Sequence, residues 1–217
     1  RLGLKSLILE KSENPGGQLH WIQDHLVDYP GFTGTGPELA ETIRAQIASD
    51  RIHLVTGVEV RRILTEQEAS ENCFVLDTSG GMVKGRAVLL ASGLRPRPLR
   101  VLQAYEGRGL VYTSRPREDF RGENLIIVGG GDGAVENAVL LADQWKRITI
   151  VYRGERLRAQ AGLLDKMNAC KNVDVMLETE VERGLGGDSL EGVIVAGRRE
   201  SQLPAERVLA KIGFEVQ

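Results

Sequence analysis

Apolar residues fall along this chain in short blocks whose spacing predicts alternating strands and helices. In the second half, an apolar block at 125–128 precedes a stretch of helical periodicity at 133–145, and a largely apolar block follows at 148–152. Unbroken apolar blocks are typical of strands in a buried parallel sheet, and a period of 3.6 residues is typical of helices. One further helix and three further strands are predicted at 157–169, 173–177, 190–196 and 207–212. The order predicts a parallel, doubly wound α/β sheet.

The first half of the chain contains shorter blocks of the same kinds. Strands are predicted at 6–10, 52–56, 58–64, 73–77, 82–84 and 87–91. A helix is expected from Pro37 to about Ser49, because proline suits the first turn of a helix. Residues 94–99 alternate arginine and proline, which is typical of a stiff connector. We therefore expect two domains, at 1–103 and 104–217.

The composition is that of a folded globular protein, with 41% hydrophobic and 27% charged residues among 217. A net charge of −2 gives no reason to expect nucleic acid or an anionic membrane as a partner. No apolar run approaches the roughly 20 residues that span a membrane, so no membrane span is expected. The two cysteines, Cys73 and Cys170, form no CxxC pair. Reduced structural thiols are the simplest interpretation, and they favour a cytoplasmic protein.

The turn after residue 128 is the strongest local signal for chemistry. Gly129, Gly131 and Ala134 fit the pattern G-x-G-x-x-A between a predicted strand and a predicted helix. The first glycine permits the tight turn, the second lets a pyrophosphate approach the backbone, and the small third residue lets the helix pack closely. The helix N-terminus offers free N–H groups to phosphate. The candidate nucleotide-binding residues of this turn are Gly129, Gly130, Gly131, Asp132, Gly133 and Ala134.

The end of the following strand selects between the two nicotinamide cofactors. NAD sites place an acid there for the ribose 2′-hydroxyl, whereas NADP sites place arginine near the 2′-phosphate. Here the strand ends at Tyr152-Arg153-Gly154, and Arg158 follows. Arg153 and Arg158 therefore favour NADP(H), since guanidinium groups match phosphate. Glu155 argues in the other direction, and a solvated basic turn is the alternative interpretation.

Several motifs in order make the chain resemble the thioredoxin reductases and their close relatives. The matching segments are residues 8–19, 28–40, 89–99, 128–142, 148–160 and 209–217. The resemblance implies two Rossmann-type domains that bind FAD and NADPH, commonly in a homodimer. It also implies a set of FAD contacts at Glu10, Gly16, Gly17, Gln18, Asp28, Val60, Ala91, Ser92 and Gly93. In this set Glu10 would bind the ribose, Asp28 would lie near the isoalloxazine, and Val60 would meet the adenine through its backbone.

The sequence departs from the family pattern in three respects. The redox dithiol of the family is absent, because residues 109–116 contain no cysteine. The N-terminal flavin strand with its glycine turn and the C-terminal return to the flavin are also missing, so the FAD half is incomplete in this chain. We therefore expect the chain to be the retained or ordered part of a longer protein. Finally, the His-Arg-Arg run of the family is replaced by Tyr152-Arg153-Gly154.

Three hypotheses follow. The first is an NADPH-dependent flavoprotein that passes electrons directly to an external acceptor such as ferredoxin, as its dithiol-lacking relatives, the ferredoxin/flavodoxin–NADP reductases, do. The flavin performs the chemistry in such an enzyme, so no catalytic side chain is expected. The second is a disulfide reductase that acts on a thioredoxin-like partner with a thiol from outside this chain. The third is a non-catalytic NADP(H)-binding module.

Overall fold

The computed structural model describes residues 3–22, 25–26, 29–64, 73–114 and 119–216. The chain divides into two compact units, which we call the N-terminal unit (residues 1–93) and the C-terminal unit (residues 94–217). Within the described residues, no helix combines the length and the apolar composition that crossing a bilayer requires.

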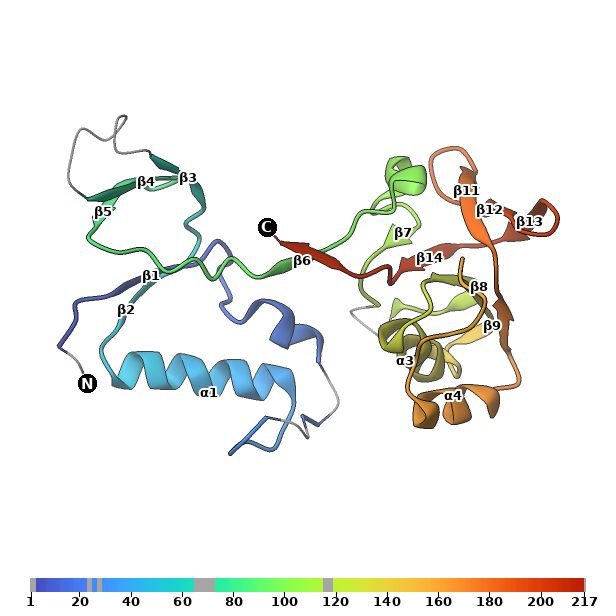
Figure 1. Ribbon diagram of the computed structural model, residues 1–217, viewed down its shortest axis with the longest axis horizontal. Coiled ribbons are helices and arrows are strands. Elements are labelled where there is room, and N and C mark those ends of the chain that lie inside the picture. The colour runs from blue at the N-terminus through green and yellow to red at the C-terminus, as the bar shows by residue number, and fades with distance from the viewer. Residues whose placement is uncertain (1–2, 23–24, 27–28, 65–72, 115–118, 217) are drawn as a thin grey trace. The chain divides into compact units, whose positions relative to one another are not determined.

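The N-terminal unit contains a parallel strand pair, a long helix and an antiparallel sheet (Figure 1). Strands β1 (Leu7–Leu9) and β2 (His53–Val55) pair in parallel. The chain between them forms the short 3-10 helix η1 (Gly17–Trp21) and helix α1 (Gly36–Ser49). The antiparallel sheet consists of β3 (Val60–Leu64), β4 (Phe74–Thr78) and β5 (Gly81–Gly85). The predicted helix and hairpin are therefore confirmed.

A capping box explains where helix α1 begins. The backbone N–H of Thr35 donates to Glu38 Oε2 at 2.7 Å, and the Thr35 hydroxyl donates to the same oxygen at 3.0 Å. The backbone N–H of Glu38 pairs in turn with the Thr35 side chain. This reciprocal pairing satisfies N–H groups that the first turn of a helix leaves without partners. The same hydrogen bonds hold the pKa of Glu38 below its usual value of 4.5.

The prediction of a strand at 87–91 is wrong. The structure has no strand at 86–93, and the side chains of Leu89 and Leu90 are 92% and 71% exposed. A strand needs a neighbour for its backbone hydrogen bonds, and no described strand pairs with this segment. Its apolar composition alone therefore did not produce a strand.

A five-stranded parallel sheet forms the centre of the C-terminal unit, in the order β10-β9-β8-β14-β7. Its strands are β7 (Leu110–Val111), β8 (Gly122–Val128), β9 (Trp145–Val151), β10 (Val173–Met176) and β14 (Arg207–Ala210). Helices α3 (Asp132–Leu141) and α4 (Ala161–Asn168) pack on one face, where Ile127, Ile150 and Leu209 are fully buried. The predicted α/β class with a parallel sheet is confirmed.

The other face of this sheet is covered by a separate antiparallel sheet and a 3-10 helix. The second sheet consists of β11 (Glu180–Leu185), β12 (Gly192–Ala196) and β13 (Ser201–Pro204), and the helix is η2 (Arg100–Tyr105). Val193 and Val195 of β12 pack there against Val208. The strand expected at 190–196 is therefore present, but it lies outside the parallel sheet.

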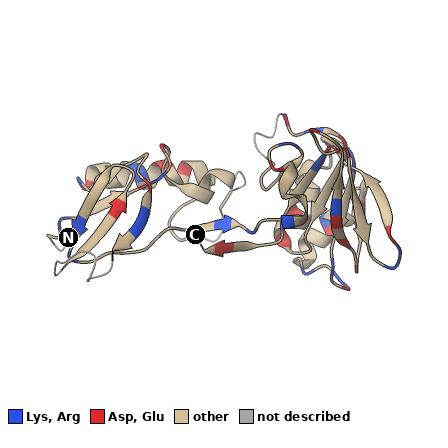
Figure 2. Ribbon diagram, turned by 90° about the horizontal axis from the view of Figure 1, so that it is seen from above, with Lys and Arg blue, Asp and Glu red and all other residues tan. Residues whose placement is uncertain are grey.

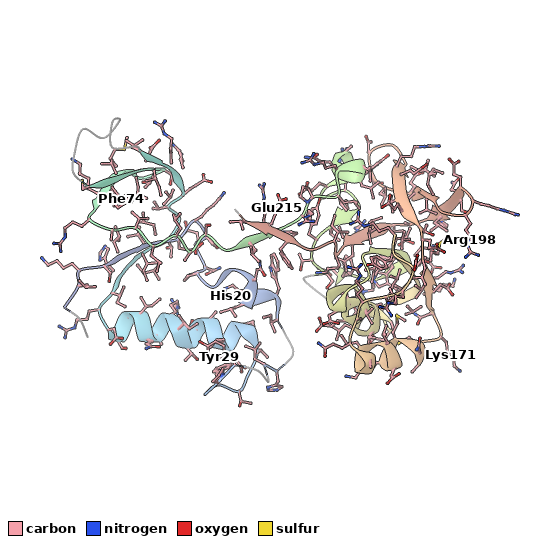
Figure 3. The ribbon with its side chains drawn as sticks, viewed as in Figure 1. His20, Tyr29, Phe74, Lys171, Arg198 and Glu215 are labelled. Atoms are coloured by element: carbon pink, nitrogen blue, oxygen red, sulfur yellow. The ribbon has the colours of Figure 1, made fainter. Side chains whose placement is uncertain are left out.

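Two further expectations differ from the structure. Trp145, expected to end a helix, instead begins β9, and α3 already ends at Leu141. The indole N–H of Trp145 donates to the Phe120 carbonyl at 2.9 Å, and the buried indole packs edge-on against the Phe120 ring. The stiff connector contains β6 (Leu94–Pro96), which pairs with β15 (Phe214–Val216). Glu215, labelled in Figure 3, joins this ribbon through a 2.9 Å ion pair with Arg95.

Candidate nucleotide-binding site

The site lies where the parallel sheet changes the direction of its connections. Strands β8 and β14 are neighbours, but the chain proceeds from β8 toward β9 on the far side. In open α/β sheets, such a switch point leaves a crevice at the carboxyl ends of the strands. Here the crevice is a cavity of about 630 Å³, which we call the nucleotide cavity. Its volume lies in the range of small-molecule sites, about 300–1,000 Å³.

Gly129 makes the sharp turn from β8 into this cavity. Its φ of +142° is a conformation that residues with a side chain rarely adopt. A Cβ at this position would run into the carbonyl oxygen of Lys211. The N–H of Lys211 also donates to the Val128 carbonyl at 2.7 Å, so the two strand ends lie close together. A glycine is therefore required here by the protein backbone itself.

Gly131 and Gly133 differ from Gly129, because nothing lies within 4 Å of where their Cβ atoms would be. Gly131 is the N-cap of α3, and its φ of −95° is ordinary for any residue. The start of α3 therefore borders open space at these two glycines. Ala134, only 1% exposed, packs into the core. This arrangement fits the pyrophosphate of a dinucleotide.

The Asp132 carboxylate, at the start of α3, accepts hydrogen bonds from another residue of the protein. Its Oδ1 accepts from the Gln160 backbone N–H at 2.8 Å, and its Oδ2 accepts from the Gln160 side-chain amide at 3.0 Å. Gln160 is the N-cap of α4, so the carboxylate ties the beginnings of α3 and α4 together. We interpret Asp132 as a residue that orders the loop around the turn.

Arg153 and Arg158 follow the end of β9, as the cofactor-selecting position requires. Arg153 lines the nucleotide cavity, and its Nη1 lies 3.9 Å from Glu180 Oε1. The backbone N–H of Arg158 donates to the Gly130 carbonyl at 2.6 Å, which holds the arginine-bearing loop against the glycine turn. Both arginines also line a wider groove of about 1980 Å³ beside the cavity. This arrangement fits a 2′-phosphate.

Tyr152 is a site residue that the sequence analysis did not single out. Its ring packs against Gly130, and a Cβ on Gly154 would lie 2.6 Å from its Cε1 and 3.0 Å from its hydroxyl oxygen. The ring therefore excludes a side chain at 154, where the family pattern has arginine. No local sequence pattern identifies this ring, because its contact with Gly130 depends on the fold.

Lys211 and Tyr112 also line the nucleotide cavity and were not predicted. The Lys211 ammonium donates to the Tyr112 carbonyl at 3.1 Å. The Tyr112 hydroxyl accepts from the Leu99 N–H at 3.1 Å, and partial burial raises the pKa of this phenol. Lysine at 211 therefore adds a positively charged side chain to the lining of the nucleotide cavity.

The residues assigned to FAD by resemblance lie in the N-terminal unit. Glu10 follows β1, and its carboxylate accepts from the Ser12 N–H at 2.8 Å. Its carbonyl accepts from the Val58 N–H at 3.0 Å, which brings it near Val60 at the start of β3. An acid at the end of a parallel strand fits a ribose.

The remaining FAD assignments have less regular surroundings. Gly16 and Gly17 have φ values of +129° and +51°, and Gln18 lies in η1. A Cβ on Gly16 would lie 2.8 Å from the Ala40 Cβ, so this turn needs glycine to pack on α1. Ala91, Ser92 and Gly93 lie in the segment without a strand, and Asp28 lies outside the described residues.

Comparisons with known proteins identify the family of this chain. Residues 31–182 match the family model described as pyridine nucleotide-disulphide oxidoreductase. A ferredoxin–NADP reductase of Salinispora tropica is 30% identical over 221 residues, covering 98% of this chain and 67% of that protein. Another, of Rhodospirillum rubrum, is 32% identical over 230 residues, covering 98% and 66%. The chain thus spans about two thirds of the length of these relatives.

Solved structures show the same fold. Thioredoxin reductase of Lactococcus lactis superposes with a TM-score of 0.86 at 22% identity, covering 98% of this chain and 70% of that one. Bacillithiol disulfide reductase of Staphylococcus aureus superposes with a TM-score of 0.82 at 17% identity, with the same two coverages of 98% and 70%. These matches confirm the resemblance to thioredoxin reductases that the motifs predicted.

Proposed function

Because this chain belongs to the pyridine nucleotide-disulphide oxidoreductase family, we propose that it is the nucleotide-binding part of an NADPH-dependent flavoprotein reductase that delivers electrons to a ferredoxin-like protein. Its cofactors are NADPH and FAD. Bound together, the two cofactors supply hydride and electron transfer, and the protein positions them.

The glycine turn at the switch point is the observation that carries this proposal. Gly131 and Gly133 leave open space at the start of α3, next to a cavity of about 630 Å³. Free N–H groups at a helix start stabilise phosphate through hydrogen bonds and the helix dipole. In this role α3 holds the pyrophosphate of NADPH, and Arg153 and Arg158 bind its 2′-phosphate.

The N-terminal unit supplies FAD contacts in this proposal. Glu10 binds the FAD ribose, while the glycines at 16 and 17 and the backbone of Val60 line the rest of the cofactor. Leu89 and Leu90 belong to an apolar segment that is exposed in this chain.

A ferredoxin-like acceptor is favoured over a disulfide substrate by two observations. The chain lacks the CxxC pair that an internal dithiol relay needs. The relatives at 30% and 32% identity are named ferredoxin–NADP reductases. We further propose that the protein works in the cytoplasm as a homodimer. Lys/Arg and Asp/Glu residues are interspersed along the ribbon of the C-terminal unit (Figure 2).

The test uses the purified full-length protein with FAD bound. Its visible spectrum is recorded, NADPH is added without oxygen, and ferredoxin is then supplied. Bleaching of the flavin bands by NADPH and their recovery with ferredoxin are the expected results. Flavin that stays oxidised with NADPH would overturn the proposal. Recovery with an oxidised disulfide substrate but not with ferredoxin would instead identify a disulfide reductase.

A further inference from the structure

Glu180 is the one carboxylate among the described residues that line the nucleotide cavity. Its Oε1 lies 3.9 Å from the Arg153 Nη1, and the two side chains are 63% and 78% exposed. A hydrated ion pair at this separation contributes little to stability, so either group can take another partner at small cost. Both residues also line the neighbouring groove, so the pair lies where cavity and groove meet.

Backbone hydrogen bonds bring Glu180 to this position. The Tyr152 N–H donates to the Met176 carbonyl at 2.9 Å, and the Thr179 N–H donates to the Tyr152 carbonyl at 3.1 Å. These bonds extend the pairing of β9 with β10 past the strand ends. Residue 180 therefore begins β11 beside Arg153, although the two are far apart in sequence.

Other nearby acids are less suited to act on a bound nucleotide. Glu178 pairs with Arg198, labelled in Figure 3, at 3.3 Å. Glu155 and Glu178 line the groove but not the nucleotide cavity. Glu180 is thus the acid that shares the cavity with Arg153.

The Arg153 guanidinium and the Glu180 carboxylate suit different groups at the 2′ position of the adenosine ribose. A guanidinium binds the 2′-phosphate of NADP(H), and a carboxylate accepts a hydrogen bond from the 2′-hydroxyl of NAD(H). A carboxylate also repels a 2′-phosphate. Many sites carry one of these groups at the end of the second strand, whereas here the arginine follows β9 and the acid comes from β11.

We propose that Arg153 and Glu180 together set the cofactor preference, with Glu180 lowering the affinity for NADPH and supporting that for NADH. The site then accepts both cofactors with only a modest preference for NADPH. This inference rests on the proposed function, because it deepens the assignment of the same nucleotide site.

The expected changes follow from removing one charge at a time. Glu180→Gln removes a repulsion at a hydrated rim, which should strengthen binding of a 2′-phosphate by about three- to tenfold. The same change should weaken binding of a 2′-hydroxyl ligand about twofold, since glutamine keeps an acceptor oxygen for the hydroxyl but loses its charge. Arg153→Gln should weaken 2′-phosphate binding by roughly tenfold and leave the hydroxyl ligand unchanged.

The experiment measures binding to the full-length protein by calorimetry, so flavin chemistry does not enter. The two probes are 2′,5′-ADP and 5′-AMP, which differ only at the 2′ position. Glu123→Gln is the matched control, because Glu123 forms a 2.8 Å ion pair with Lys146 and lines no part of the cavity. It should leave the ratio of the two affinities at the wild-type value.

Outcomes separate this inference from the proposed function. A Glu180→Gln ratio that shifts toward 2′,5′-ADP, and falls back toward wild type at high salt, supports the inference. An unchanged ratio, or equal weakening of both probes, overturns it while leaving the nucleotide site intact. Wild-type protein that binds neither probe overturns the proposed function together with the inference.

Discussion

Alanine substitutions at Gly129 and Gly131 should separate the folding role of the turn from its binding role. At Gly131 the space for a Cβ is open and φ is −95°, so no strain is introduced. Alanine is a poorer N-cap than glycine by about 0.5–1 kcal/mol. It also reduces the entropy of the unfolded chain, which offsets this by about 0.4–1 kcal/mol. Gly131→Ala should therefore change the free energy of unfolding by less than about 0.5 kcal/mol.

Nucleotide binding should respond to Gly131→Ala much more strongly. The added methyl group lies in the open space at the start of α3, where a pyrophosphate would approach. Displacing the phosphates weakens hydrogen bonds to charged groups that contribute about 1.5–3 kcal/mol each. Losing one of them corresponds to roughly a 10- to 100-fold weaker affinity for NADPH.

Gly129→Ala should behave differently, because its φ is +142° and its Cβ would meet the Lys211 carbonyl. Strained backbone of this kind costs on the order of 1–3 kcal/mol. Stability and binding should both fall.

The assay is thermal unfolding without ligand, combined with calorimetric titration of NADPH for each variant. The reasoning is refuted if Gly131→Ala destabilises the protein as much as Gly129→Ala does. It is also refuted if Gly131→Ala binds NADPH as tightly as the wild type.

Two further predictions concern the arginine loop and the cap of α1. Gly154→Arg alone should barely improve 2′,5′-ADP binding, because its Cβ would lie 2.6 Å from the Tyr152 ring. Combined with Tyr152→His, whose shorter ring lacks the distal atoms, the same change should improve 2′,5′-ADP binding several-fold. Additive effects of the two substitutions in a double-mutant cycle would contradict this prediction. The lowered pKa of Glu38 means that its carboxylate stabilises the fold above the usual pKa of 4.5 and that this contribution is lost as pH falls through the lowered pKa. Glu38→Gln should therefore melt below wild type at pH 7, and the difference should shrink as pH falls through the lowered pKa of Glu38. A difference that stays the same in acid would contradict the capping role.

The sequence alone determined the features that depend on a few adjacent residues. Gly129, Gly131 and Ala134 identified the turn, because a tight strand-to-helix connection restricts which residues fit at fixed spacing. The periodic apolar positions located α3, and Pro37 located the start of α1. Arg153 was identified because the end of the second strand has a known place relative to the turn.

Tertiary structure decided whatever depends on partners distant in sequence. Residues 87–91 have the composition of a buried strand, yet Leu89 is 92% exposed because no described strand pairs with its segment. Trp145 begins a strand because it pairs with Gly122 of β8, and its indole bonds to Phe120.

The same reason explains why Glu180 could not be identified from the sequence. No local pattern connects it to Arg153, and only the extension of the pairing between β9 and β10 brings the two charges within 3.9 Å. A turn motif is encoded by neighbouring residues, whereas the charge opposite an arginine is set by which strands lie side by side.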